Sequence, residues 1–259
     1  MARQLVQLSD PHFVADPTGT LMGIPPRESL GRVVGEAQRE VPDRVIVTGD
    51  LAQDGSPDAY AALGEALTPL EAPCHGLPGN HDDKSVLAEA LQQPPFRSGS
   101  AFTVGEWRVL LLDSAVPGAD HGQLSSASLE ALDTELSAHR DRPTLLALHH
   151  SPVPVGAAWL DPINLRAPDA LRRVVAAHPQ VQAILFGHVH QAVDAQWDDV
   201  SLLGCPSTCF QFAPHEDTFA LDPAPPGYRT VTLHEDGSFE TAVHRVPVPF
   251  TVDTSATGY

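Results

Sequence analysis

Basic residues are scarce in this sequence of 259 residues. It carries 15 lysines and arginines against 33 aspartates and glutamates, which gives a formal net charge of −18. A chain this acidic repels the phosphates of nucleic acids and anionic lipids, so we expect neither a nucleic acid nor a membrane as a partner. A small anionic substrate remains compatible with this charge if metal cations reverse the local field.

Cysteines and long apolar runs are scarce as well. The three cysteines, Cys74, Cys205 and Cys209, are an odd number without a disulfide framework, which predicts a reducing, cytoplasmic setting. Cys205 and Cys209 lack the further ligands of a zinc–thiolate site, so we expect buried thiols. No apolar run approaches the roughly 20 residues of a membrane span. Asp10 interrupts the first apolar stretch, so no secretion signal is expected.

The apolar periodicity predicts an α/β fold. A chain of this length forms one large domain or two small ones. Because it shows no repeat or linker, we predict a single domain over residues 1–249 and a disordered tail over 250–259. Apolar strands alternate with amphipathic helices up to residue 186, and the remainder has the pattern of β-structure. The predicted strands are 4–8, 45–48, 74–77, 107–113, 144–148, 183–186, 200–203, 208–212, 228–233 and 239–243. Two packed sheets with helices outside accommodate this order.

Five apolar segments end in side chains that commonly bind metals. The central one, Val45–Thr48, holds three β-branched aliphatic residues and runs into Gly49 and Asp50, which is typical of a buried parallel strand. The side chains that follow the five segments are Asp10 and His12, Asp50, Asn80 and His81, His149 and His150, and His188 and His190. Ligands of open α/β sheets collect beyond the carboxyl ends of the strands. We therefore predict one metal site assembled around Asp50.

The donor set indicates two transition-metal ions. The predicted ligands are Asp10, His12, Asp50, Asn80, His149, His188 and His190. Mixed imidazole and carboxylate donors suit iron, manganese, zinc or cobalt better than calcium or magnesium. Seven ligands are too many for the coordination shell of one ion, but they match two ions that share one carboxylate. Such two-metal sites are used for nucleophilic attack at phosphorus.

Each piece of the pattern alone has an ordinary explanation. Asp-x-His occurs by chance, Gly-Asp often forms a structural turn, and adjacent histidines can be core or surface residues. Gly187-His188-Val189-His190 is more informative, because alternate residues of an extended segment point to one side. The order and spacing of all five pieces, each behind an apolar strand, favour the metal site.

These motifs resemble the full motif set of the calcineurin-like metallophosphoesterases. The pieces are Asp10-x-His12, Gly49-Asp50, Gly79-Asn80-His81-Asp82, His149 and Gly187-His188-x-His190, over about residues 5–190. The resemblance implies a four-layer αββα sandwich of two mixed sheets flanked by helices. It also implies an enzyme, a metal-dependent phosphoric diester hydrolase that uses two divalent ions, with iron and manganese favoured over zinc or cobalt.

The resemblance also assigns roles to the site residues. One ion is expected among Asp10, His12, Asp50 and His190, and the other among Asp50, Asn80, His149 and His188, with Asp50 bridging. His149 is chosen over His150 because in similar motifs the ligand ends the strand directly. The substrate is expected to lie against His12, Asp50, Asn80, His81 and His190. His81 is the expected catalytic residue, which protonates the leaving oxygen or stabilises its charge, with Asp82 or neighbours of Asp50 as candidates to orient it.

Further segments resemble one subgroup, the bacterial cyclic AMP phosphodiesterases. They include Pro206–Phe212 and Pro226-Gly227-Tyr228-Arg229. This likeness implies hydrolysis of 3′,5′-cyclic AMP to 5′-AMP by attack of a metal-bridging hydroxide on phosphorus. The alternatives are a broader phosphodiesterase, acting on glycerophosphodiesters or 2′,3′-cyclic nucleotides, and a non-catalytic scaffold on the same fold. The oligomeric state stays open, with a dimer among the options.

Residues that recognise the base are not evident from the sequence. The loop residues Trp159, Asn164, Arg166 and His121 could edge the pocket, but each is at least as consistent with ordinary packing or surface. Phe210 and Phe212 are predicted to be core residues.

Overall fold

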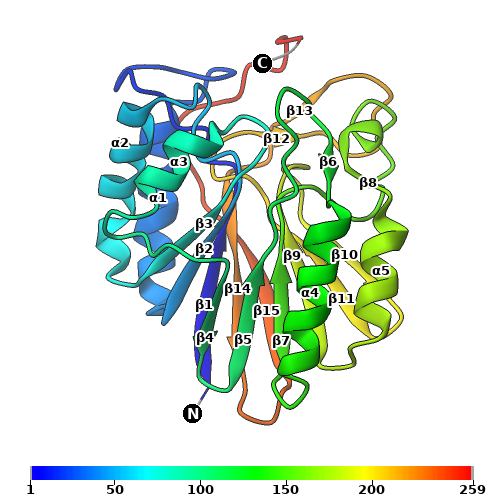
Figure 1. Cartoon of the computed structure of the whole chain (residues 1–259). Coiled ribbons are helices and arrows are strands. Elements are labelled where there is room, and N and C mark those ends of the chain that lie inside the picture. The colour runs from blue at the N-terminus through cyan, green and yellow to red at the C-terminus, as the bar shows by residue number, and fades with distance from the viewer. Residues whose placement is uncertain (1, 258–259) are drawn as a thin grey trace.

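Two mixed β-sheets form the centre of the molecule (Figure 1). The structure is a computed structural model and describes residues 2–257. The first sheet has the order β15-β14-β1-β2-β3, in which β1, β2 and β3 are parallel. Its strands are β1 (Arg3–Leu8), β2 (Arg44–Thr48), β3 (Cys74–Leu77), β14 (Gly227–Leu233) and β15 (Phe239–Arg245).

The second sheet has the order β10-β11-β9-β7-β5-β4, with four parallel strands inside and an antiparallel strand at each edge. Its strands are β4 (Ala101–Val104), β5 (Trp107–Leu111), β7 (Thr144–Ala147), β9 (Val181–Phe186), β10 (Val193–Trp197) and β11 (Val200–Gly204). Two short ribbons add β6 (Gly122–Gln123) with β8 (Leu165–Arg166), and β12 (Gln211–Phe212) with β13 (Leu221–Asp222).

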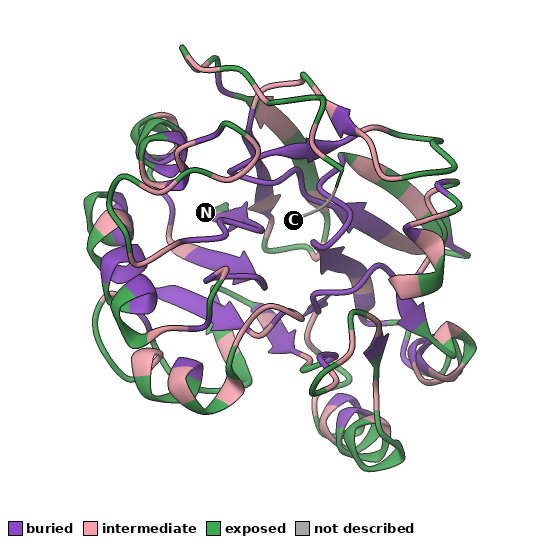
Figure 2. Cartoon of the chain, turned by 90° about the horizontal axis from the view of Figure 1, so that it is seen from above, coloured by how far each residue is buried: buried purple, intermediate pink, exposed green. Residues whose placement is uncertain are grey.

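Helices cover the outer faces of both sheets, as the view from above in Figure 2 shows. α1 (Pro26–Ala37), α2 (Pro57–Leu67) and α3 (Lys84–Ala90) lie on the first sheet, and α4 (Ser126–Ala138) and α5 (Pro168–Ala176) lie on the second. The start of α2 follows from its sequence: Ser56 Oγ accepts a hydrogen bond from the Ala59 N–H, and Pro57 occupies the first helical position.

Three hydrophobic cores separate the four layers. Along β2, Val45 and Val47 pack toward the helices, whereas Ile46 between them packs into the space between the sheets. β7 alternates in the same way, with Leu146 against its helices and Leu145 between the sheets. Because successive residues of a strand face opposite sides, strands that are apolar on both faces require a layer on each side. The predicted αββα sandwich is therefore confirmed.

Most predicted strands are present, and the structure adds others, among them the short strands β6, β8 and β13. β4 and β10 were not predicted, because their residues alternate between buried and exposed and lack a continuous apolar run. The predicted strand 208–212 is reduced to the two residues of β12, since Thr208 and Cys209 bond to Ser9 and Ser207 instead of a neighbouring strand. No helix among the described residues is long and apolar enough to cross a membrane.

The single domain and the disordered tail stay predictions. Residues 258 and 259 of the tail lie outside the described part of the chain. Before them, Phe250, Val252 and Ala256 pack partly buried against the core beneath α4 and α5, and the Asp253 N–H donates to the Met22 carbonyl.

Candidate metal centre

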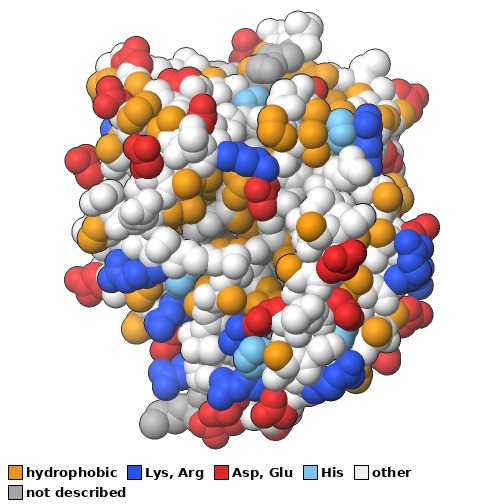
Figure 3. Space-filling model, in the orientation of Figure 1, with side chains coloured by type: hydrophobic (Ala, Val, Ile, Leu, Met, Phe, Trp, Pro, Cys, Tyr) orange, Lys and Arg blue, Asp and Glu red, His pale blue; other side chains and the backbone are white. Residues whose placement is uncertain are grey.

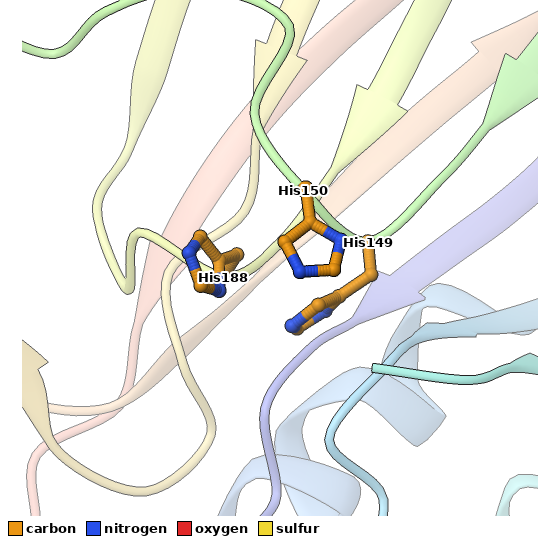
Figure 4. Close-up of side chains that lie close together, drawn as sticks. All are labelled: His149, His150 and His188. Carbon is orange, nitrogen blue, oxygen red and sulfur yellow. The ribbon is translucent and has the colours of Figure 1, made fainter. Parts of the chain in front are cut away.

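The structure brings the five predicted strand ends together at one edge of the two sheets. Imidazole nitrogens or carboxylate oxygens lie within 4.8 Å of one another in four overlapping groups. These groups are Asp10, His12 and His190; Asp10, Asp50 and His149; His12, Asp50 and His81; and His149, His150 and His188. Figure 4 shows the last group, in which His149 and His150 follow β7 and His188 follows β9. Asn80 joins the cluster through its Oδ1, 3.1 Å from His149 Nε2.

The backbone around these residues is held in an uncommon conformation. Asp10, His12, Asp50, His188 and His190 all have φ between 46° and 67°, a region that few residues other than glycine adopt. Such strain concentrates at functional sites, where the surrounding structure enforces it.

Glycines at the strand ends make room for the cluster. A Cβ atom at Gly49 would collide with the ring of His149. A Cβ atom at Gly79 would collide with the carboxylate of Asp50, and one at Gly187 would collide with Ser9 Oγ and Asp10 Oδ2. The glycine before each turn is therefore needed for close approach between chain segments.

Three imidazoles are oriented so that their Nε2 atoms face the cluster. His12 Nδ1 lies 2.7 Å from Gln53 Oε1, and His190 Nδ1 lies 2.8 Å from the Phe210 carbonyl oxygen. His149 Nδ1 lies 2.8 Å from the Thr48 carbonyl oxygen. Because these oxygens only accept, each Nδ1 carries a proton, and Nε2 is the nitrogen directed at the cluster.

These Nε2 atoms lie close to one another and to carboxylate oxygens. His12 Nε2 and His190 Nε2 are 3.1 Å apart, and His149 Nε2 lies 3.3 Å from Asp50 Oδ2. His188 Nε2 is buried without a hydrogen-bond partner among the described residues. Acceptors that converge in a buried space repel one another unless a cation lies between them. The cluster of His and Asp donors therefore fits a dimetal site.

Burial and mutual attraction shift the protonation of the cluster. Burial lowers the pKa of His12 to about 3, so its imidazole is neutral and able to bind a metal. Burial opposes ionisation of Asp50, but attraction by His149 holds the pKa of Asp50 well below its usual range. Burial likewise opposes protonation of His149, yet Asp50 and Asp10 raise the pKa of His149 to about 9. A metal ion at His149 would therefore have to replace a proton.

Asp50 has the central place that the sequence predicted for it. Its Oδ2 lies 3.3 Å from His149 Nε2 and 3.8 Å from His12 Nε2, so it reaches both halves of the cluster. Its Oδ1 accepts a hydrogen bond from the His81 N–H. Asp10 lies between His190 Nε2 at 3.4 Å and His149 Nδ1 at 3.9 Å, and it accepts from the His188 N–H.

His149 and His150 differ in what their rings contact. Both nitrogens of His150 are engaged away from the carboxylates, with Nδ1 2.9 Å from Ser114 Oγ and Nε2 3.1 Å from the Asp120 carbonyl oxygen. His149 Nε2 instead faces Asp50 and Asn80. The ligand role of His149 is therefore better supported than that of His150.

His81 lies at the rim of the cluster. Its ring makes an edge-to-face contact with His12, with centroids 5.1 Å apart, and its side chain is partly exposed. Asp82, a candidate to orient His81, has other partners. Its carboxylate accepts from the backbone N–H groups of Leu51, Ala52 and Gly79 and from Tyr60 OH, so it ties the ends of β2 and β3 together.

Several residues that support the cluster were not predicted. Gln53 and the Thr48 and Phe210 carbonyl groups orient imidazoles, but no local sequence signal marks such contacts. Phe210 and Phe212 are buried as expected, and they also stack on His12 and His190, with centroids 5.3 Å and 4.2 Å apart.

Two of the loop residues considered for base recognition have structural contacts. Trp159 packs edge-to-face against Phe212 and Phe219, and Asn164 bonds to Asp161 through its side chain and to Gly122 through its backbone.

Comparison with known proteins points to one family. The sequence model of the calcineurin-like phosphoesterases matches residues 4–192. The chain is 43% identical to the 3′,5′-cyclic adenosine monophosphate phosphodiesterase CpdA of Pseudomonas aeruginosa, over 98% of this chain and 94% of that protein. It is 42% identical to CpdA of Escherichia coli strain K12, over 99% of this chain and 94% of that protein. A solved dimetal phosphatase from Danio rerio has a similar fold, with a TM-score of 0.67 and 17% identity over 95% of this chain and 99% of that chain.

Proposed function

The chain belongs to the calcineurin-like phosphoesterase family, and on that premise we propose that it hydrolyses 3′,5′-cyclic AMP to 5′-AMP. The identity to phosphodiesterases of this specificity extends over nearly the whole chain, beyond the residues of the metal cluster. The buried arrangement of imidazoles that converge on Asp50 is the observation that supports catalysis over a scaffold role. A scaffold has no need for convergent acceptors that are unfavourable without cations.

We propose that two divalent ions occupy the cluster. Asp10, His12, Asp50 and His190 would hold one, and Asp50, Asn80, His149 and His188 would hold the other. The mixed nitrogen and oxygen donors favour iron or manganese, with zinc or cobalt as substitutes. When bound, the ions supply the nucleophile and neutralise phosphoryl charge.

The residues of the chain bind the substrate and move one proton. The phosphate lies against His12, Asp50, Asn80, His81 and His190. Water adds to phosphorus and the bond to the ribose 3′ oxygen breaks. His81, at the rim, donates a proton to that oxygen as it leaves, and its partial exposure lets it regain a proton from solvent. The product is 5′-AMP.

We also propose that the substrate is a small phosphodiester and that the protein is located in the cytoplasm. All three cysteines are free and buried, as a reducing compartment allows.

A substrate panel tests the proposed function. Manganese-loaded protein is assayed with 3′,5′-cyclic AMP, 2′,3′-cyclic AMP, glycerophosphocholine and bis(4-nitrophenyl) phosphate, and kcat/KM is compared. We expect the highest value for 3′,5′-cyclic AMP among the natural diesters. A higher value for 2′,3′-cyclic AMP or glycerophosphocholine would replace the proposed substrate and leave the family assignment in place. No hydrolysis of any diester would support the scaffold alternative.

A further inference from the structure

A cavity of about 400 Å³ lies directly beside the metal centre. One wall consists of Gly79, Asn80 and residues 82–85, on the segment that runs from the end of β3 into α3. The opposite wall is the segment 115–118, between β5 and β6. Figure 3 shows that this face of the molecule is hollowed near its centre, between the parts of the chain that carry α3 and α4. We call this space the side cavity.

The side cavity is continuous with the cluster through Asn80. This residue lines the cavity, and its Oδ1 lies 3.1 Å from His149 Nε2 in the cluster. A phosphodiester held at the cluster therefore has one of its substituents close to the cavity mouth. The volume falls in the range of about 300–1,000 Å³ that small-molecule sites occupy.

Lys84 connects the two walls and is the only lysine in the sequence. Its ammonium pairs with Asp113 Oδ2 at 2.7 Å and donates to the Ala115 carbonyl oxygen at 2.6 Å. An ammonium has three N–H donors, so one is left for a ligand. The side chain is 36% exposed. In a chain with a net charge of −18, this places a positive donor beside the reaction centre.

Both walls are held in place by their own hydrogen bonds. Asp113 Oδ1 accepts from the Ala115 N–H, which fixes the turn opposite Lys84. Asp83 Oδ1 accepts from the N–H groups of Ser85 and Val86, which fixes the start of α3. The cavity is therefore largely formed before a ligand arrives, as small-molecule sites usually are.

We propose that the side cavity binds the nucleoside part of the substrate, with Lys84 as a specificity-determining residue. This inference rests on the proposed function. Ala115, Val116 and Pro117 offer an apolar surface for the flat face of a purine. The third Lys84 N–H would donate to an acceptor nitrogen on the purine edge. A metal centre would bind the phosphate of any diester, whereas this cavity would distinguish a nucleotide from a diester without a base.

Two variants test the assignment against a substrate without a nucleoside. The measured quantity is the ratio of kcat/KM for 3′,5′-cyclic AMP to kcat/KM for methyl 4-nitrophenyl phosphate. Lys84→Met removes the charged donor, so we expect the ratio to fall roughly 10-fold or more. Val116→Trp fills the cavity with a bulky ring and should lower the ratio similarly. Arg172→Met, which removes a surface cation paired with Asp198, is the matched control and should leave the ratio unchanged.

The single lysine also allows a direct binding test. Wild-type protein loaded with manganese is acetylated with an N-hydroxysuccinimide ester, and the rate at Lys84 is followed by peptide mass spectrometry. We expect 5′-AMP to slow acetylation at least about fivefold and inorganic phosphate at the same occupancy to have little effect. Equal protection by both would show that only the phosphate site matters and would overturn the assignment.

The outcomes separate this inference from the proposed function. If wild-type protein hydrolyses 3′,5′-cyclic AMP but neither variant changes the ratio, the cavity assignment is wrong and the function stands. If wild-type protein hydrolyses methyl 4-nitrophenyl phosphate but not 3′,5′-cyclic AMP, the proposed function fails, and the nucleoside assignment fails with it.

Discussion

Replacing Gln53 should weaken metal binding although Gln53 is not a predicted ligand. Its Oε1 accepts a hydrogen bond from His12 Nδ1 at 2.7 Å, which fixes the ring and directs Nε2 toward the cluster. Loss of such a supporting contact typically weakens metal affinity by about 10–100-fold. Because Gln53 is only half-buried, water can partly replace its oxygen. We therefore expect Gln53→Leu to weaken binding of the manganese ion proposed beside His12 about 10-fold, or about 1.4 kcal/mol.

The assay is competition with a chromophoric chelator at pH 7.5, supported by unfolding with and without manganese. Gln53→Leu should lose about 1.4 kcal/mol of the metal-induced stabilisation at saturating metal. Gln53→Glu keeps the acceptor and should bind at least as tightly as wild type. Gln92→Leu removes an exposed glutamine whose side chain donates to the Ala88 carbonyl, and it serves as control. Wild-type affinity in Gln53→Leu would refute the reasoning.

Three further predictions concern catalysis and stability. His81→Ala should lower kcat by about 10²–10⁴ with metal content intact by elemental analysis; loss of metal would contradict the proton-donor role. Burial, with Arg44 and Arg97 nearby, lowers the pKa of His75 to about 4. The unfolded chain therefore binds more protons below pH 6.5, and stability falls as pH falls, by about 1.3 kcal/mol between pH 7.5 and 5.5. His75→Leu should remove this contribution to the fall in the free energy of unfolding, measured by urea unfolding of metal-free protein. An unchanged pH dependence in the variant would count against the role of His75. Arg229→Met should lower the free energy of unfolding by about 2–4 kcal/mol in the same assay, because the buried guanidinium donates to carbonyl groups of β10 and β11. A decrease below about 0.5 kcal/mol would contradict a stabilising role for these hydrogen bonds.

The site could be predicted from the sequence because its residues follow strands that are apolar on both faces. Asp50 illustrates this, since a run of buried residues leads directly into it and parallel strands end at a common edge. The same apolar runs located most strands of the two sheets. β10 was missed because it is an edge strand, with Asp194 and Gln196 exposed between less exposed residues.

Contacts between distant side chains could not be predicted in this way. Gln53 is hydrogen-bonded to His12, which is 41 positions away in the sequence. His190 is hydrogen-bonded to the Phe210 carbonyl, and the position of that carbonyl depends on the whole fold. The side cavity has the same origin, because Lys84 and Asp113 come together only when both sheets are in place.

The central claim is that the buried His and Asp cluster holds a pair of metal ions. Anomalous X-ray diffraction from crystals of manganese-loaded protein tests it most directly. We expect two anomalous peaks about 3.5–4 Å apart, both within bonding distance of the Asp50 carboxylate. Peaks elsewhere on the surface, or no peak at the cluster under saturating manganese, would contradict the account.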